Sequence, residues 1–323
     1  MNEPLPQGQP LLQVRDLRVR YRGDAGAGQR VAVDGVSFDL AAGESLGLVG
    51  ESGSGKSSIA RALLRLVPAR GTAHFEGQDL LQMRGATLRA TRERLQIIFQ
   101  DPLAALDPRM RVAEIVAEPL REFLPQLTAA ERRARATSML ERVGLDGSHL
   151  DRFPHEFSGG QAQRIGIARA LMLGPKLLIC DEPVASLDVS ITAQIVNLLH
   201  DLRRELDLAL LFIAHDLATV RQACERVMVL YHGQVMEIAP RKQLYAAPRH
   251  PYTRALLAAV PVPDPTRSQP LGLARPESAG TAGRATGCVF HSRCPQAFAR
   301  CASETPVLRR CGAGLAACHL PDI

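Results

Sequence analysis

The stretch GESGSGKS, at residues 50–57, follows a strand-like apolar run and precedes a helix-like one. Its spacing is that of a phosphate-binding loop, G-x-x-x-x-G-K-[ST]. Glycines let backbone N–H groups turn toward phosphate oxygens, and the helix that follows presents its positive end to the same anion. Lys56 is expected to reach the β- and γ-phosphates, and the Ser57 hydroxyl to bind Mg²⁺. The sequence therefore predicts a nucleoside triphosphate site formed by Gly50, Glu51, Ser52, Gly53, Ser54, Gly55, Lys56, Ser57 and Ser58.

A second chemical element is LLICDE, at residues 177–182, an apolar strand that ends in two carboxylates. Asp181 suits the magnesium shell, and Glu182 suits the general base that activates water. Apolar strands that end in acids are common without any catalytic role. The phosphate-binding loop earlier in the chain favours the catalytic interpretation.

A third element is FSGGQ, at residues 157–161, where Ser158 and Gln161 have the spacing of a capping box. Gly159 and Gly160 would each cost up to about 1 kcal/mol relative to alanine in a helix. We therefore expect a group to approach this backbone closely, and a phosphate at the helix N-terminus would meet that need. The chain thus carries two candidate phosphate cradles.

Alternating strand-like and helix-like patterns indicate an α/β core that positions these elements. From about residue 101 to 173 the pattern is helical only, which predicts an all-helical insert. Several strands are continuous apolar runs, typical of a sheet covered on both faces. A stretch rich in Pro, Gly, Ser and Ala, at 261–286, separates this core from a cysteine-bearing tail. We expect one domain over 1–260 and a linker with a small cysteine domain over 261–323.

Composition sets outer limits on function. A chain of 323 residues with 46% hydrophobic residues can build a sizeable core. The purest apolar run, Leu208 to Ala214, is far shorter than the ~20 residues that span a bilayer. The first residues lack the pattern of an export signal, so a cytoplasmic protein is expected. The net charge of +6 comes from scattered arginines, which is weak support for nucleic acid as a partner.

These motifs together resemble the ATP-binding subunit of an ABC transporter. FSGGQ is similar to the signature motif of that family, with Phe157 where leucine is more usual. The resemblance implies that two subunits pack head to tail, and that the signature of each closes over the nucleotide held by the other. Two cradles in one chain would then form two sites shared by a dimer, with itself or a sibling subunit. The implied fold is an ABC-type P-loop core with an antiparallel β subdomain and a helical insert.

Four further residues match the family position by position. Gln100, in IIFQDP, matches the glutamine that senses magnesium and the γ-phosphate, and His215, in FIAHD, matches the histidine that touches the γ-phosphate. Asp188, in SLD, matches the loop that contacts the opposite subunit, and it is equally suited to cap the next helix. Tyr21 matches the residue that stacks on adenine. Taken alone, Gln100 would be an ordinary surface residue and His215 a structural one.

Near the C-terminus, HPYTRALLAAVP and GCVFHSRCP resemble the tail of dipeptide, oligopeptide and nickel importer ATPases. The resemblance implies an ATPase that drives solute uptake through two transmembrane permeases, peripheral at the cytoplasmic face of the inner membrane, with an extracytoplasmic binding protein. Nickel, opines and glutathione remain alternative solutes. A DNA-repair ATPase would need a long coiled coil between the phosphate loop and the signature, and a translation ATPase normally carries two cassettes.

The tail cysteines are a candidate metal site, with C-x5-C-x6-C-x16-C spacing over Cys288, Cys294, Cys301 and Cys318. An odd total of seven cysteines without an export signal argues against disulfides. Thiolates bind either zinc or iron–sulfur clusters, and the tight C-x2-C pairs common in zinc sites are absent here. Related importer tails hold a 4Fe-4S cluster, so the resemblance implies one on these four residues, with zinc, or no metal at all, as the alternatives. Cys311 matches no position in this pattern.

Overall fold

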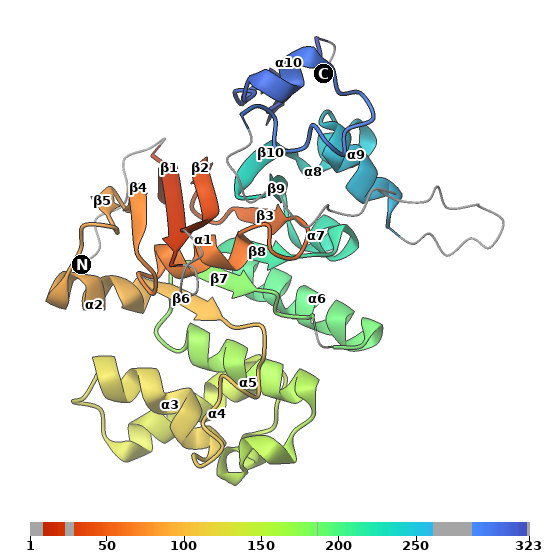
Figure 1. Cartoon of the computed structure of the whole chain (residues 1–323). Helices are drawn as coiled ribbons and strands as arrows, with labels where there is room; N and C mark the ends of the chain where they lie inside the picture. Colours follow the sequence, from red (N-terminus) through yellow and green to blue (C-terminus); the bar gives the residue numbers. More distant parts are fainter. Residues whose placement is uncertain (1–8, 23–28, 186, 261–285, 322–323) are drawn as a thin grey trace. The chain divides into compact units, whose positions relative to one another are not determined.

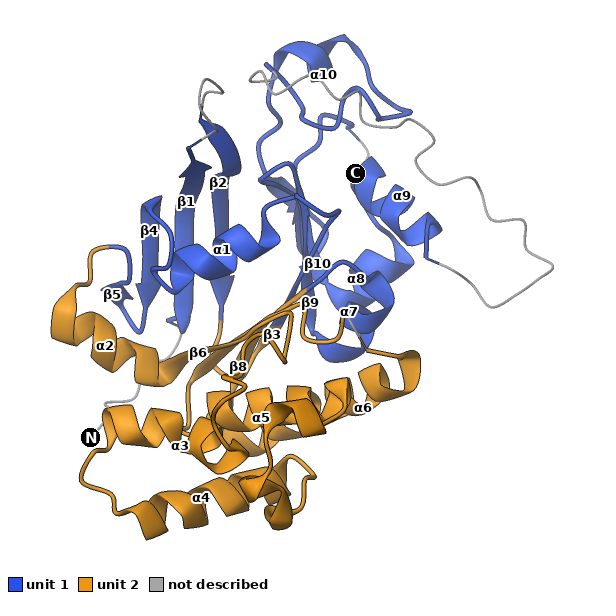
Figure 2. Ribbon diagram, turned by 60° about the horizontal axis from the view of Figure 1, so that its bottom comes forward, with its two compact units in different colours: residues 1–40, 46–81, 214–323 blue, residues 41–45, 82–213 orange. Residues whose placement is uncertain are grey.

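The computed structural model describes residues 9–22, 29–185, 187–260 and 286–321. The chain divides into two compact units: unit 1 comprises residues 1–40, 46–81 and 214–323, and unit 2 comprises residues 41–45 and 82–213. Figure 1 labels the elements, and Figure 2 shows unit 1 in blue and unit 2 in orange. Of the predicted linker, residues 261–285 lie outside the described part of the chain. Among the described residues, no helix is both long enough and apolar enough to cross a bilayer.

Unit 1 contains a four-stranded antiparallel sheet in the order β2-β1-β4-β5. Its strands are β1 (Leu12–Tyr21), β2 (Arg30–Leu40), β4 (Ala69–Phe75) and β5 (Gln78–Asp79). Leu12 of β1 pairs with Leu40 of β2 and with Phe75 of β4, and all three side chains are buried. Helix α1 (Lys56–Leu63) contacts β1 and β2, and its Ile59 and Leu63 side chains are buried. This sheet is the antiparallel β subdomain that the sequence predicts.

A second strand group of unit 1 joins the tail to the core. Strand β3 (Ser45–Val49) runs parallel to β9 (Arg226–Tyr231), which forms a hairpin with β10 (Gln234–Pro240). Two short strands of the tail, β11 (Arg309–Cys311) and β12 (Gly314–Ala316), extend this group, because β12 pairs with β10. The sequence patterns did not predict these two strands. The helices of this region are α7 (Leu217–Ala223), α8 (Arg241–Ala246), α9 (Pro251–Ala258) and α10 (Ala299–Ser303).

Unit 2 is built on parallel strands β6 (Leu95–Ile98), β7 (Leu177–Asp181) and β8 (Ala209–Ala214). Ala214, the last residue of β8, is counted in unit 1. Every residue of β7 and β8 is buried, as expected for apolar runs in a sheet covered on both faces. Helices α5 (Gly159–Leu171) and α6 (Val189–Leu206) contact each other, and α5 also contacts β6.

Between β6 and β7, the described residues form helices and no strand. The helices are α3 (Val112–Phe123), α4 (Ala129–Arg142), α5 and the 3-10 turns η1 (Gly147–Asp151) and η2 (Pro154–Glu156). Helices α3, α4 and α5 pack together (Figure 1). Helix α2 (Gly85–Arg94), just before β6, was not predicted. The longest described helix between the phosphate loop and FSGGQ has 14 residues, too short for a long coiled coil.

Candidate nucleotide site

The predicted phosphate loop lies in unit 1 between β3 and α1, and its glycines have conformations that few other residues adopt. Gly53 and Gly55 have φ angles of 78° and 104°, in the left-handed region. A Cβ atom on Gly55 would lie 2.2 Å from the carbonyl oxygen of Ala32. Ser54 O accepts a hydrogen bond of 2.8 Å from Gly233 N, in the turn between β9 and β10. The loop is therefore held by its surroundings in unit 1.

The end of this loop presents positive charge and backbone donors. The Lys56 side chain is 4% exposed, and its Nζ donates to the carbonyl oxygens of Gly50, at 2.8 Å, and Glu51, at 3.1 Å. Helix α1 begins after Gly55, which has no side chain to cap the first amides. The buried Ser54 Oγ has no hydrogen-bond partner in the part of the chain that the structure describes. These features fit an anionic phosphate ligand.

Tyr21 lies beside the first turn of the same helix. At the end of β1, its hydroxyl donates a hydrogen bond of 3.2 Å to Ser58 Oγ, in α1. This contact brings Tyr21 to the phosphate-loop helix within unit 1. The stacking of its ring on adenine stays a prediction.

In unit 2, the structure brings the predicted base together with the predicted sensor. Asp181 is the buried last residue of β7, and Glu182 follows it with a φ of 48°, a left-handed conformation that costs a non-glycine residue energy. The backbone N–H of Glu182 donates to Ile213 O at 3.0 Å. The side-chain amide of Gln100 donates to Glu182 Oε2 at 3.1 Å. Their catalytic roles stay predictions.

The FSGGQ motif forms the predicted capping box at the start of α5. The exposed Ser158 accepts a hydrogen bond from Gln161 N, and Gln161 Oε1 accepts one from Ser158 N. A Cβ atom on Gly160 would lie 2.6 Å from Ile191 Cγ2, whereas one on Gly159 would lie 3.4 Å from Leu187 Cδ2, an ordinary contact. The close approach at Gly160 is thus a side chain of the same unit. Of the two glycines, only Gly159 has no such steric reason, so phosphate approach remains as an explanation for Gly159 alone.

Asp188 caps α6, as its position before the helix suggested. Its Oδ1 accepts hydrogen bonds from Ile191 N, at 2.9 Å, and from Ser190 Oγ, at 2.7 Å. These hydrogen bonds lower the pKa of Asp188, that from Ile191 most. The neighbouring Val189 is 88% exposed. The predicted contact of this loop with a second subunit remains compatible with the capping role.

His215 follows the end of β8 and is exposed, at the edge of unit 1. The next residue, Asp216, accepts hydrogen bonds from the first amides of α7, so the turn that carries the histidine is well defined. A contact between His215 and the γ-phosphate stays a prediction.

Three predicted magnesium ligands supply oxygen donors. Ser57 belongs to unit 1, and Gln100 and Asp181 belong to unit 2. A hydroxyl, an amide oxygen and a carboxylate suit Mg²⁺, which prefers hard oxygen ligands. A bound Mg²⁺ would neutralise the charge on the β- and γ-phosphates. That these three residues share one Mg²⁺ stays a prediction. The donor set therefore fits the metal.

The four tail cysteines carry free thiols. The pKa of Cys288 is raised to about 11, mainly by burial; a backbone hydrogen bond with Phe290 opposes this, and the thiols of Cys301, Cys318 and Cys294 add smaller increases. Burial also raises the pKa of Cys294 and Cys318, with a smaller effect of Cys301 on each. The four thiols therefore lie within electrostatic range of one another. However, no three His, Cys, Asp or Glu side chains among the described residues are close enough together to hold a metal ion.

The tail also contacts the phosphate loop, and no sequence motif predicts this contact. Arg293 Nη1 and Nη2 donate to the two carboxylate oxygens of Glu51, at 2.8 and 2.9 Å. Tyr252 Oη accepts a hydrogen bond of 3.1 Å from Glu51 N. Both residues belong to stretches that the sequence analysis singled out, HPYT and HSRCP, but only as marks of resemblance.

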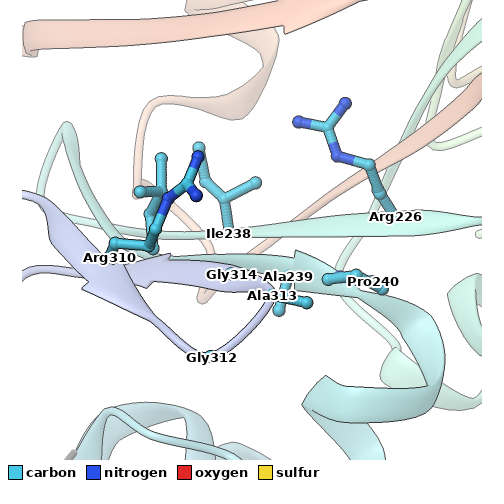
Figure 3. Close-up of a pocket in the computed structure, with 9 residues that line it drawn as sticks. Arg226, Ile238, Ala239, Pro240, Arg310, Gly312, Ala313 and Gly314 are labelled. Carbon is cyan, nitrogen blue, oxygen red and sulfur yellow. The ribbon is translucent and has the colours of Figure 1, made fainter.

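A cavity of about 360 Å³ lies elsewhere in unit 1, against β10 and the β11–β12 turn. Arg226 and Arg310 are its charged lining residues, and both point to the same side of this strand ribbon (Figure 3). Its other lining residues are aliphatic or glycine. The lining contains no nucleophile or carboxylate, so it offers no catalytic chemistry.

Comparisons with known proteins identify the family of this chain. The ABC transporter family model matches residues 33–185. The oligopeptide transport ATP-binding protein OppF of Salmonella typhimurium is 49% identical over 320 residues, covering 95% of each chain. A putative peptide import ATP-binding protein of Brucella ovis is 50% identical over 301 residues, covering 93% of this chain and 94% of that one.

Among solved structures, the ATP-binding cassette MJ0796, a dimer bound to ADP and Pi, matches with a TM-score of 0.65 and 27% identity. The match covers 71% of this chain and 98% of that one. This chain belongs to the family of ABC transporter ATP-binding proteins. It is an ABC-type ATPase, with ATP as substrate and Mg²⁺ as cofactor, and the predicted α/β ABC fold is confirmed. Its residues 236–301 match the C-terminal region of oligopeptide/dipeptide transporters.

Proposed function

We propose that this ATPase energises the import of di- and oligopeptides. The match of residues 236–301 to the oligopeptide/dipeptide transporter C-terminal region carries this proposal. The relatives that are about half identical over nearly the whole chain are named for oligopeptide transport and peptide import. Nickel, opines and glutathione are the alternative solutes.

Hydrolysis in this proposal depends on positioned charges. Lys56 and the amides at the start of α1 hold the β- and γ-phosphates. Glu182 accepts a proton from the water that attacks the γ-phosphorus, and the bond to ADP breaks. The hydrogen bond from Gln100 supports this role, because it orients the Glu182 carboxylate. His215 contacts the γ-phosphate.

The second phosphate cradle belongs to the site of another subunit. Ser158 is exposed at the start of α5 and can therefore meet a partner. The adjacent Gly159 has room beside it, unlike Gly160. The solved cassette that this chain resembles is described as dimeric. We infer a head-to-tail dimer, with itself or a sibling subunit, in which Ser158 of each subunit contacts the nucleotide of the other.

The transmembrane partners are two permease subunits, which hold the ATPase at the cytoplasmic face of the inner membrane. Phe99 and Leu103 flank the sensor glutamine and are 41% and 45% exposed. Apolar side chains exposed around Gln100 would suit a docking segment that responds to the state of the nucleotide. An extracytoplasmic solute-binding protein would deliver the peptide. No nucleic acid is involved.

The tail cysteines are proposed to hold a 4Fe-4S cluster, with zinc as the alternative. Four thiols that influence one another's pKa support this proposal. Four thiolates are the ligand set of such clusters. The cluster would supply a structural or redox-sensitive centre. Because burial favours the protonated thiols, metal binding has to displace their protons.

Uptake assays in the source cell test the proposed solute. Deletion of the coding gene is expected to abolish accumulation of a radiolabelled tripeptide, and the wild-type gene to restore it. The Glu182→Gln gene is the matched control, since its product keeps the fold and loses the base. Retained tripeptide uptake together with lost uptake of radioactive nickel would replace peptide by nickel.

A further inference from the structure

The phosphate loop carries a negative charge of its own, which is unexpected in a loop that binds an anion. Glu51 is the second residue of GESGSGKS, and its carbonyl oxygen accepts a hydrogen bond from the Lys56 ammonium. An uncompensated carboxylate beside the β- and γ-phosphates would weaken nucleotide binding by like-charge repulsion. The charge of Glu51 therefore needs a partner that stays in place.

That partner is Arg293, which comes from the tail. Its guanidinium binds both oxygens of Glu51 as a fork, and Nη1 also lies 3.3 Å from Tyr231 Oη. The Arg293 side chain is 10% exposed and that of Glu51 is 31% exposed. The hydrogen bonds with Glu51 raise the pKa of Arg293. Two parallel charge-assisted bonds fix the orientation of the carboxylate as well as neutralising it.

The backbone of Glu51 is also held by a residue from outside the phosphate loop. Its N–H donates to Tyr252 Oη, and Tyr252 is fully buried. The rings of Tyr231, Tyr252 and Phe290 form a cluster with centroids 4.7 to 5.4 Å apart. The Arg293 guanidinium lies 5.6 Å from the centre of the Tyr231 ring. Phe290 and Arg293 both belong to the tail segment that carries Cys288 and Cys294.

This support is anchored to the core of unit 1. Glu237, on β10, accepts hydrogen bonds from the backbone N–H groups of Arg249 and His250, just before α9. His250 Nδ1 in turn accepts one from Tyr252 N. These bonds determine where the Tyr252 hydroxyl meets the loop.

We propose that Arg293 and Tyr252 are positioning residues of the nucleotide site in their own chain. They hold Glu51 by its side chain and by its amide, so that the Gly50 and Glu51 carbonyls stay where Lys56 needs them. Arg293 also removes the repulsion between Glu51 and the phosphates. This inference rests on the nucleotide site assigned above and gives the tail a part in nucleotide binding.

A double-mutant cycle with Glu51 tests the proposal by titration of the purified full chain with ADP and Mg²⁺ in a calorimeter. ADP has no γ-phosphate, so no hydrolysis accompanies the titration and only the affinity is measured. Arg293→Ala is expected to raise the Kd for ADP by roughly tenfold. In a Glu51→Gln chain, the same change is expected to alter the Kd by less than about twofold, because no charge remains to neutralise. Arg293→Lys keeps the charge without the fork, so its Kd is expected to lie in between.

Arg15→Ala is the matched control, since Arg15 on β1 makes a similar fork to Asp39 on β2, at 2.7 and 2.8 Å. It is expected to leave the Kd unchanged. A Kd for Arg293→Ala within about twofold of wild type would overturn the proposal, as would an equal loss in both Glu51 backgrounds. If Arg293→Ala does not fold, Arg293→Gln replaces it with the same outcomes. Lys56→Ala tests the nucleotide site itself. If this variant binds ADP with the wild-type Kd, the assignment of the site is wrong. If its binding is weakened, the site assignment holds, and the Arg293 results test only the Arg293 proposal.

Discussion

The side-chain amide of Gln100 donates a hydrogen bond of 3.1 Å to Glu182 Oε2, although 82 residues separate the two in sequence. Both residues belong to unit 2, Glu182 directly after β7 and Gln100 two residues after β6. Strands β6 and β7 are parallel neighbours, so their carboxyl ends meet at one edge. The proposed base is therefore oriented by a hydrogen bond from the proposed sensor.

Glu182→Gln is expected to retain nucleotide binding and to lower hydrolysis at least about a hundredfold, because the amide cannot accept the water proton. The amide oxygen can still accept the hydrogen bond from Gln100, so the geometry should persist. Phosphate release and ADP affinity, measured on the same preparation, check both parts. Turnover within about threefold of wild type would mean that another group is the base.

The shared dimer site predicts complementation between two inactive variants, if the subunit pairs with itself. Ser158→Arg blocks the signature and Lys56→Ala disables the phosphate loop, so each alone should hydrolyse no ATP. A mixture should recover activity, because one mixed-dimer site combines an intact loop with an intact signature. Proven mixed dimers without any recovery would argue against sharing.

A matched substitution controls for loss of the helix cap in Ser158→Arg. Thr128 forms the same capping box with Glu131 at the start of α4 and is also exposed. Thr128→Arg should cost similar stability, about 1 kcal/mol, without loss of hydrolysis. Equal losses of activity in the two arginine variants would assign the effect to folding.

The two glycines of FSGGQ should respond differently to alanine. Gly160→Ala is expected to lower the free energy of unfolding by roughly 1–3 kcal/mol, because its Cβ would meet Ile191 at 2.6 Å. Gly159→Ala should not lower stability, since its Cβ has an ordinary contact and alanine favours the helix. We expect Gly159→Ala to lower hydrolysis instead. Urea denaturation and phosphate release separate the two effects, and full activity of Gly159→Ala would remove phosphate approach as its explanation.

The tail cysteines should bind iron in protein purified without oxygen. Broad absorbance near 400 nm and roughly four irons per chain are expected from four thiolate ligands. Cys294→Ser and Cys318→Ser should remove the colour. Cys311→Ser is the control, because Cys311 Sγ contacts Arg309 O and belongs to no part of the spacing. A colourless anaerobic preparation with one zinc per chain would support the zinc alternative.

His250 should make the stability of the protein depend on pH. Burial lowers the pKa of His250 to about 4 from 6.5, a backbone hydrogen bond with Ala317 opposes this effect, and Arg254 adds to it. The unfolded chain therefore binds a proton that the folded chain excludes between these two pH values. Stability from this group is complete above about pH 6.5 and is lost as the pH falls toward 4, on the order of 3 kcal/mol.

Denaturant unfolding at several pH values checks this expectation. His250→Asn keeps a side-chain acceptor for Tyr252 N but does not titrate, so its stability should vary less over this range. His155→Asn, at an exposed position, is the control. Parallel pH profiles for wild type and His250→Asn would show that His250 does not cause the dependence.

The sequence alone determined the features that rest on neighbouring residues. The glycines of the phosphate loop and the capping box of Ser158 are local, because backbone conformation and i to i+3 hydrogen bonds involve residues close in the chain. The apolar runs of β7 and β8 likewise indicated buried parallel strands. The resemblance of the motifs to a known family then predicted the fold and the ATPase activity.

Only the tertiary structure decided which distant side chains meet. The Ile191 side chain lies so close to Gly160 that a Cβ atom would not fit there. Gln100 donates a hydrogen bond to Glu182, and Arg293 binds Glu51 across 242 residues of sequence. No local pattern encodes these pairs, because each depends on how strands and helices pack after they form. Arg293 is one of many arginines in the sequence, and only the structure shows that it binds Glu51 and lies beside the ring of Tyr231.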